Sequence, residues 1–264
     1  MAQITDRQKT EIEWDQNAVP AFTAIAGGRR VRVIFGGQTV ADSRRALLVL
    51  ERQRLPVYYF PVEDVRREWL APSGHQEAHS GHGAASYWTV TVGKKNAQRA
   101  AWSYDKPEHA ELAGHLAFVF QKMDAWFEED DEIFAHPRSP YHRVDVLNSS
   151  RRVKVVIDGE PVAESDRPRI LIETGLPPRY YLPKVDVRLD LLTPTATHTR
   201  CPYKGEASYW SVTVNGKEHK DIVWGYPAPL SECSRIENLV CFYNEKVDLY
   251  LDGELQERPK SPWS

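Results

Sequence analysis

A 20-residue phrase occurs twice in this chain, and this repeat restricts the possible folds more than any other feature. ASYWTVTVGKKNAQRAAWSY begins at Ala85 and ASYWSVTVNGKEHKDIVWGY begins at Ala207, so the copies are 122 residues apart. The same offset relates Asp64-Val65-Arg66 to Asp186-Val187-Arg188 and extends over more than 70 residues around the phrase. Solenoid units usually measure about 20–50 residues. The repeat therefore indicates a tandem duplication of one whole domain.

The 264 residues suit two domains of ordinary size. The polar, Pro-rich stretch His136–His142 is the expected linker, and Val144–Leu147 is expected to enter the second repeat. Beyond Phe120 and Phe242 the register between the copies is expected to slip by two residues. The predicted division is an N-terminal arm at 1–28 without a counterpart between the repeats, a first domain at 29–146 and a second domain at 147–264.

Each repeat is predicted to be mainly β. Val31–Phe35 and Val153–Ile157 end in Gly-Gly and Asp-Gly, which are hairpin signals because these residues tolerate positive φ. Tyr87–Val92 and Tyr209–Val214 alternate apolar and polar residues, with Trp102 and Trp224 on the returning strands. Further strands are expected at Ala46–Leu50 and Ile170–Ile172, short helices at Val62–Leu70, Pro107–His115 and Ser231–Glu237, and a last hairpin at Asp252-Gly253.

Composition narrows the classes of partner and the compartment. The formal net charge of −3 gives no basic field for nucleic acid. No apolar run is long enough to span a membrane, and the N-terminus lacks a signal peptide. Cys201, Cys233 and Cys241 all fall in the second repeat, and an odd, unmatched set predicts a reducing cytoplasm rather than a disulfide framework. Cofactor and oligomeric state stay open.

Several strings resemble one known family, the bacterial domain-of-unknown-function family 427. They are YYLPKVDVRLDLL, TRCPYKGEASYWSVTVNGK, VWGYPAPLSECSRIENLVCFYNEKVDLYLDGE and AWFEEDDEIFAHPRSPYHRVDVL. The resemblance covers nearly the whole chain twice. It implies two tandem β-tent-like domains, each made of small antiparallel sheets with one or two short helices, and it implies no agreed function. Family members sometimes carry a nucleotidyltransferase label, but the chain has no Gly-Ser followed by paired aspartates. It also lacks the Cys-x-x-Cys knuckles of zinc-containing relatives.

The repeated aromatic residues are the first candidates for a function. Neighbours on a strand point to opposite faces, so Tyr87 and Trp88 are predicted to line different surfaces. One interpretation is that the rings fill a small core. The other is a pocket that stacks a planar or cationic ligand. Trp224 is expected to be more exposed than Trp210, because it adjoins Gly225. The candidate ligand-binding residues are Trp88, Trp102, Tyr104, Tyr203, Trp210, Trp224 and Tyr226.

Cys201 and Lys204 are candidate catalytic residues in the string Cys-Pro-Tyr-Lys-Gly. A nearby lysine favours a reactive thiolate, and His198 is a possible base. The alternative is a loop packing motif. The first repeat has His79 and His82 at the same positions.

Two further groups of residues are weaker candidates for a functional site. His75, His79 and His82 have spacings that suit a metal site on a helix, but Pro72 and nearby glycines predict a loop. The repeated acids are paired as Glu51 with Glu173 and Asp64 with Asp186, while Arg179 corresponds to Val57. Acid–base chemistry and plain salt bridges are both open for them, with salt bridges favoured.

The leading hypothesis is a protein that binds a small planar ligand in an aromatic-walled pocket beside Cys201 and Lys204. The alternatives are an enzyme, either cysteine-dependent or nucleotidyltransferase-like, and a protein-interaction module. A reactive Cys201 thiol would favour the enzyme, and a large exposed apolar patch would favour the interaction module.

Overall fold

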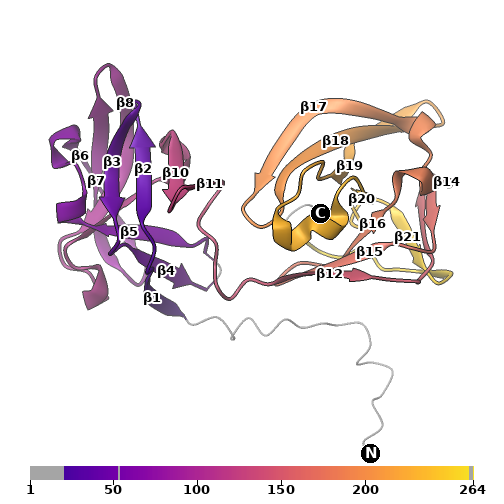
Figure 1. The fold of residues 1–264 in the computed structure, drawn as a ribbon, viewed down its shortest axis with the longest axis horizontal. Helices are drawn as coiled ribbons and strands as arrows, with labels where there is room; N and C mark the ends of the chain where they lie inside the picture. Colours follow the sequence, from indigo (N-terminus) through magenta and orange to yellow (C-terminus); the bar gives the residue numbers. More distant parts are fainter. Residues whose placement is uncertain (1–20, 53, 262–263) are drawn as a thin grey trace, which may run out of the picture. The chain divides into compact units, whose positions relative to one another are not determined.

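The computed structural model describes residues 21–52, 54–261 and 264, and they form two mainly β domains. The contacts divide the chain between Ser139 and Pro140. The prediction of two mainly β domains built from antiparallel sheets is confirmed (Figure 1). Within the described residues, no helix has both the length and the apolar character needed to cross a membrane.

The first domain contains a seven-stranded and a four-stranded sheet, both with antiparallel pairing. The order in the larger sheet is β1 (Phe22–Ala26), β4 (Leu47–Glu51), β5 (Val57–Pro61), β9 (His115–Phe118), β8 (Lys95–Tyr104), β7 (Gly83–Val92) and β6 (Leu70–His79). The order in the smaller sheet is β11 (Asp131–Ile133), β10 (Ala125–Glu128), β2 (Val31–Phe35) and β3 (Gln38–Ser43).

The second domain repeats this arrangement strand for strand. The order in its larger sheet is β12 (Val144–Asn148), β15 (Arg169–Glu173), β16 (Arg179–Leu182), β20 (Val240–Phe242), β19 (Lys217–Gly225), β18 (Gly205–Val214) and β17 (Leu192–Cys201). The order in its smaller sheet is β14 (Glu160–Ser165), β13 (Val153–Ile157), β21 (Asp248–Leu251) and β22 (Glu254–Leu255).

The first strand of each domain shows that one expectation, an N-terminal arm without a counterpart, needs correction. In β1, Phe22 pairs with Glu51, and in β12, Val144 pairs with Glu173 at the same offset. The segment before Arg29 therefore does have a counterpart, and this part of the prediction is wrong. The sequences of β1 and β12 share little, because a strand at the sheet edge needs backbone pairing more than particular side chains. Residues 1–20 of the expected arm lie outside the described part.

The predicted hairpins are confirmed, but two predicted helices are shorter than expected. Residues 62–70 hold two separate 3₁₀ turns, η3 (Val62–Asp64) and η4 (Arg67–Trp69), rather than one helix. In the segment 107–115 only η5 (Ala110–Leu112) is helical, because His115 already begins β9. The short helix predicted at Ser231–Glu237 is confirmed as η9 (Ser231–Ile236).

The register slip between the copies also occurs earlier than predicted. Trp102 pairs with Ala117, whereas Trp224 pairs with Cys241, so a shift of two residues is already present in β9 and β20. The additional residues lie in the segment that forms η9, which is longer than η5. In the last strands the shift falls to one residue, since Trp126 and Leu249 pair with Val33 and Val155.

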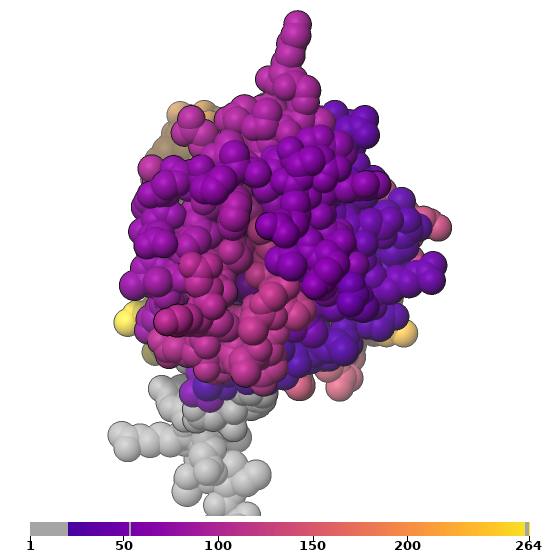
Figure 2. Space-filling view, turned by 90° about the vertical axis from the view of Figure 1, so that its left-hand side faces the viewer, coloured from indigo at the N-terminus to yellow at the C-terminus, as the bar shows by residue number. Residues whose placement is uncertain are grey.

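Each larger sheet has a buried cluster on both faces. One face packs against the smaller sheet, as Phe60 and Val90 do against Val33 and Trp126 in the first domain. Distant segments of that domain, coloured indigo to magenta, form one closely packed surface (Figure 2). In the second domain the other face curves around η9, with β12 and β17 on opposite sides of it (Figure 1). The Arg235 side chain of η9 donates a hydrogen bond to the Val146 carbonyl of β12.

Candidate functional site

The repeated aromatic phrase supplies side chains to both faces of each larger sheet. Tyr87, Trp102 and Tyr104 belong to one cluster, whereas Trp88 packs in the cluster between the sheets. In the second domain Trp224 and Trp210 are divided in the same way. The prediction that adjacent aromatic residues line different surfaces is therefore confirmed.

The expected order of exposure for the second pair of tryptophans is wrong. Trp224 is only 7% exposed, and its indole N–H donates to the Tyr181 hydroxyl at 3.2 Å. Trp210 is the half-buried one. Gly225 does not leave room beside Trp224, because a Cβ at this glycine would lie 2.5 Å from the Leu239 carbonyl oxygen. The neighbouring backbone occupies that space, so the glycine permits a close approach of two chain segments.

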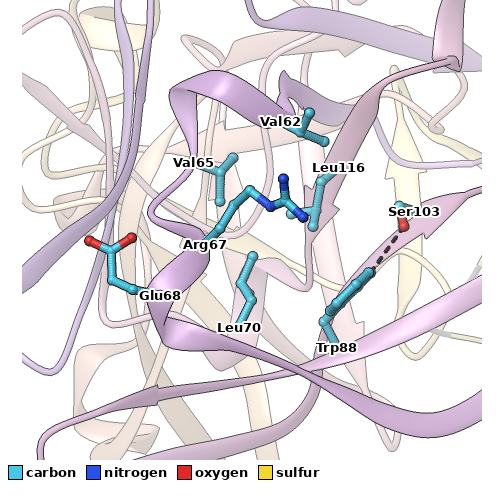
Figure 3. A pocket seen from close by; sticks show the side chains of 8 residues that line it. All are labelled: Val62, Val65, Arg67, Glu68, Leu70, Trp88, Ser103 and Leu116. Carbon is cyan, nitrogen blue, oxygen red and sulfur yellow. Dashed lines mark hydrogen bonds between the residues drawn. The ribbon is translucent and has the colours of Figure 1, made fainter.

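Trp88 lines a pocket of about 450 Å³ in the first domain, here named the Trp88 pocket (Figure 3). Its other walls come from η3, η4, β6, β8 and β9. The indole N–H of Trp88 donates to the Ser103 hydroxyl at 3.0 Å, which satisfies the polar edge of the ring and fixes its orientation. The remaining lining residues are Val62, Val65, Arg67, Glu68, Leu70 and Leu116.

Two charged residues of η4 border the Trp88 pocket. The Arg67 side chain extends toward Val62 and Leu116, whereas the Glu68 carboxylate points away (Figure 3). Among the described residues, Arg67 is not engaged in an ion pair, which leaves its guanidinium available to a ligand. In the second domain the ammonium of Lys184, the counterpart of Val62, lies 5.3 Å from the centre of the Trp210 ring.

Lys204, a predicted catalytic residue, lies in a buried charged group of the second domain. Its ammonium contacts both carboxylate oxygens of Glu173, and the His142 imidazole lies 3.0 Å from one of them. The His142 ring stacks on Tyr203 with 4.1 Å between ring centres. Burial alone would raise the pKa of Glu173, but the hydrogen bond from His142 and the charge of Lys204 outweigh it and lower this pKa. The side-chain nitrogen of Lys204 is thus paired with a carboxylate inside the domain.

Cys201 ends β17 and is half-buried against the cluster that contains Tyr226. Cys233 and Cys241 are fully buried, and burial raises their pKa values to about 11 and about 12. The proposed base His198 is half exposed, and its imidazole lies 3.7 Å from a carboxylate oxygen of Glu206.

The first domain keeps the same positions with different chemistry. His82 stands at the position of Lys204, and its Nε2 lies 2.8 Å from the carboxylate of Glu51, the counterpart of Glu173. His79 stands at the position of Cys201, and its ring nitrogens lie 2.7 Å and 3.0 Å from the hydroxyls of Tyr104 and Tyr87. A nitrogen-bearing side chain, Lys204 in one domain and His82 in the other, therefore lies beside a glutamate in both interiors.

The three candidate metal ligands take separate roles. His75 and His79 lie on β6, so the predicted loop is a strand, with a bulge that accommodates Gly74. His75 packs near Tyr87, while His82 is buried beside Glu51. Across the described ranges, no group of three or more His, Cys, Asp or Glu side chains is arranged to hold a metal ion.

The repeated acids form salt bridges, as the favoured interpretation predicts. Asp64 contacts Arg45 and the Ser43 hydroxyl, and Asp186 makes the equivalent contacts with Arg167 and Ser165.

Sequence reasoning missed the partner of Arg179. This guanidinium forms two hydrogen bonds with Glu245, at 2.7 Å and 2.6 Å, and the two side chains are 6% and 0% exposed. It also lies 5.5 Å from the centre of the Trp224 ring. The sequence did indicate that this position differs between the repeats, because Arg179 in the second repeat corresponds to Val57 in the first. Glu245 gave none, because the repeats are out of register at that point.

The comparison with known families agrees with this duplicated architecture. The family model NTP_transf_9, described as a domain of unknown function (DUF427), matches the chain at residues 23–129 and again at 145–253. These matches cover most of the chain, so the protein belongs to this family and carries two of its domains in tandem. No curated protein matches the chain.

Proposed function

We propose that this protein binds a small planar ligand with a negative charge in the Trp88 pocket. The observation that carries the proposal is one hollow that combines a fixed indole, apolar walls and the guanidinium of Arg67, which forms no ion pair within the described part of the chain. An aromatic ring of the ligand would stack on Trp88, and its anionic group would pair with Arg67.

The size and character of the pocket support this proposal. Ligand sites usually measure roughly 300–1,000 Å³, with apolar walls and few polar groups that fix orientation. The Trp88 pocket, at about 450 Å³, falls in this range. Arg67 favours an anion, because guanidinium groups form strong paired hydrogen bonds with carboxylates and phosphates.

The second domain supports assigning this role to the first. There the cation near the indole is the protein's own Lys184, which lies over the face of Trp210. Val62 occupies the same position in the first domain and leaves the indole without that cover. The duplicated sheet thus carries one tryptophan with an internal partner and one available to a ligand.

Calorimetric titration of the full chain tests the proposal with three matched probes. Naphthoate is planar and anionic, naphthylmethylammonium is planar and cationic, and cyclohexanecarboxylate is anionic without an aromatic ring. Naphthoate should bind most tightly. Arg67→Gln should weaken its binding about fivefold, the loss expected for an exposed charged contact, and Trp88→Leu should weaken it more.

The matched controls are the equivalent changes in the second domain, Lys184→Gln and Trp210→Leu, which should leave naphthoate affinity unchanged. Equal affinity for naphthoate and naphthylmethylammonium would contradict the assignment of an anionic ligand. Retention of naphthoate binding in Trp88→Leu would contradict the pocket itself.

A further inference from the structure

A second hollow of the first domain lies against Trp102 and takes its walls from both buried clusters of that domain. This Trp102 cavity measures about 230 Å³ and has predominantly apolar walls. The indole N–H of Trp102 donates to the Tyr59 hydroxyl at 3.1 Å, so the ring is held in place. Its lining includes Val57, Trp102, Phe118, Val119, Phe120 and Gln121. His136 also borders it, and its Nδ1 lies 2.7 Å from the Pro137 carbonyl oxygen.

The second domain fills the equivalent space with its own side chains. Two planar groups lie against Trp224: the Tyr243 ring, with 4.4 Å between ring centres, and the Arg179 guanidinium, 5.5 Å from the indole centre. Glu245 neutralises the guanidinium through two hydrogen bonds. Trp224 is buried as a result, whereas Trp102 is only half-buried.

The strand pairing fixes the counterparts of these residues. Val57 pairs with Val49 as Arg179 pairs with Leu171. The backbone N–H of Val119 donates to the Ala100 carbonyl, and that of Tyr243 donates to the Ile222 carbonyl at the equivalent position. Two residues further on, Gln121 therefore corresponds to Glu245. In the first domain valines replace the arginine and the tyrosine, and this loss of volume opens the Trp102 cavity.

The charge at the cavity distinguishes the possible occupants. The arginine and its glutamate are both replaced by uncharged residues, so the carboxylate that would neutralise a cation has no counterpart at this position. A buried cation without a partner is costly. Gln121 donates its amide N–H to the Ala135 carbonyl at 3.4 Å, which leaves its side-chain carbonyl oxygen as an acceptor for a hydroxyl.

We propose that the Trp102 cavity is a second binding site, which takes an uncharged phenol-sized ring in the place that Tyr243 fills in the second domain. An apolar cavity of about 150 Å³ is known to hold benzene, so the larger Trp102 cavity has room for a phenol. The ring would stack on Trp102, and its hydroxyl would donate to Gln121. This site is separate from the Trp88 pocket and does not depend on the function proposed there.

The test uses p-cresol, the isolated side chain of tyrosine, added to the ¹⁵N-labelled full chain. The indole N–H resonance of Trp102, assigned by its disappearance in Trp102→Phe, should shift with saturation. Methylguanidinium, the isolated head group of Arg179, should not shift it. A comparable shift with methylguanidinium, or no shift with either probe, would overturn the proposal.

Filling the cavity should abolish the site. Val119→Tyr places the counterpart of Tyr243 in the first domain and should weaken p-cresol binding at least tenfold. The double change Val57→Arg with Gln121→Glu recreates the ion pair and should have the same effect. Arg67→Gln, which alters only the Trp88 pocket, should leave p-cresol binding intact. Undiminished binding in a folded Val119→Tyr variant would place p-cresol elsewhere and overturn the proposal. If neither filled variant folds, the Trp102 resonance of the unaltered chain decides.

Discussion

The two domains share their strand order and pairing but differ in what fills the interior of the larger sheet. The second domain contains two buried ion pairs, Lys204 with Glu173 and Arg179 with Glu245. The first has His82 beside Glu51 at one of these positions and uncharged residues at the other. The difference teaches that strand pairing, rather than the chemistry of the interior, defines this fold.

The replacement of a buried ion pair by uncharged residues also distinguishes a domain with a filled interior from one with a cavity. A buried ion pair is tolerated only when its geometry repays the loss of hydration, and it holds the surrounding side chains in fixed positions. Burial alone would raise the pKa of Glu245, but the hydrogen bond from Arg179 outweighs it and lowers this pKa. In the first domain the uncharged replacements leave space beside Trp102 instead.

The largest expected effect comes from breaking the equivalent charge pairs. Glu173→Gln leaves the buried ammonium of Lys204 without its carboxylate and should destabilise the second domain by about 3–5 kcal/mol. Glu51→Gln should cost the first domain only about 1 kcal/mol, because the imidazole of His82 can keep a hydrogen bond to the new side-chain amide. Hydrogen exchange followed by mass spectrometry measures the opening free energy of each domain separately.

A double variant is the control for this comparison. Replacing Lys204 by Met and Glu173 by Leu removes both charges and should restore most of the lost stability. Equal losses in Glu173→Gln and Glu51→Gln would show that the lysine and histidine versions of the pair are energetically alike.

The tryptophans give the next largest difference. Trp224→Ala should cost about 3–5 kcal/mol, the usual range for deleting a large buried aromatic side chain. Trp102→Ala should cost about 2 kcal/mol, because half-burial leaves less surface to lose. Urea unfolding of both variants, with acrylamide quenching of the remaining indoles, checks this order. If Trp102→Ala proves as costly as Trp224→Ala, the Trp102 cavity is not open in solution.

Acid should affect the second domain through Glu173. The pKa of this carboxylate is lowered in the folded state, so its contribution is present above its ordinary pKa of about 4.3 and is lost as the pH falls through the folded value. The slope of stability against pH below about pH 4 should be shallower in Glu173→Gln, by at most about 1.4 kcal/mol per pH unit. Hydrogen exchange across this range measures it, and an unchanged slope would contradict the lowered pKa.

The smallest expected effect concerns the three cysteines, and it is measured as the rate at which each thiol is alkylated. Burial raises the pKa values of Cys233 and Cys241 to about 11 and about 12, so both should resist iodoacetamide near neutral pH. The half-buried Cys201 should react faster than either. Peptide mapping after timed alkylation distinguishes the three thiols. Equal, slow reaction of all three would remove the support for Cys201 as a nucleophile.

The sequence alone determined the duplication, the strand-rich fold and the opposite orientations of adjacent aromatic residues. These features are local or periodic. A few neighbouring residues are enough to predict an alternating strand such as Tyr209–Val214 or a turn at Asp252-Gly253. The exchanges of Lys204 for His82 and Arg179 for Val57 were also visible, because the offset between the copies held there.

Only the tertiary structure decided which tryptophan is covered and which charges meet. Trp224 is buried by Tyr181, Arg179 and Tyr243, which come from other strands or from the segment beyond the shift in register. His142 and Glu245 likewise lie far in sequence from Glu173 and Arg179, the residues they contact. Burial and charge pairing depend on side chains brought together across the sheet, and no local pattern in the sequence records those distances.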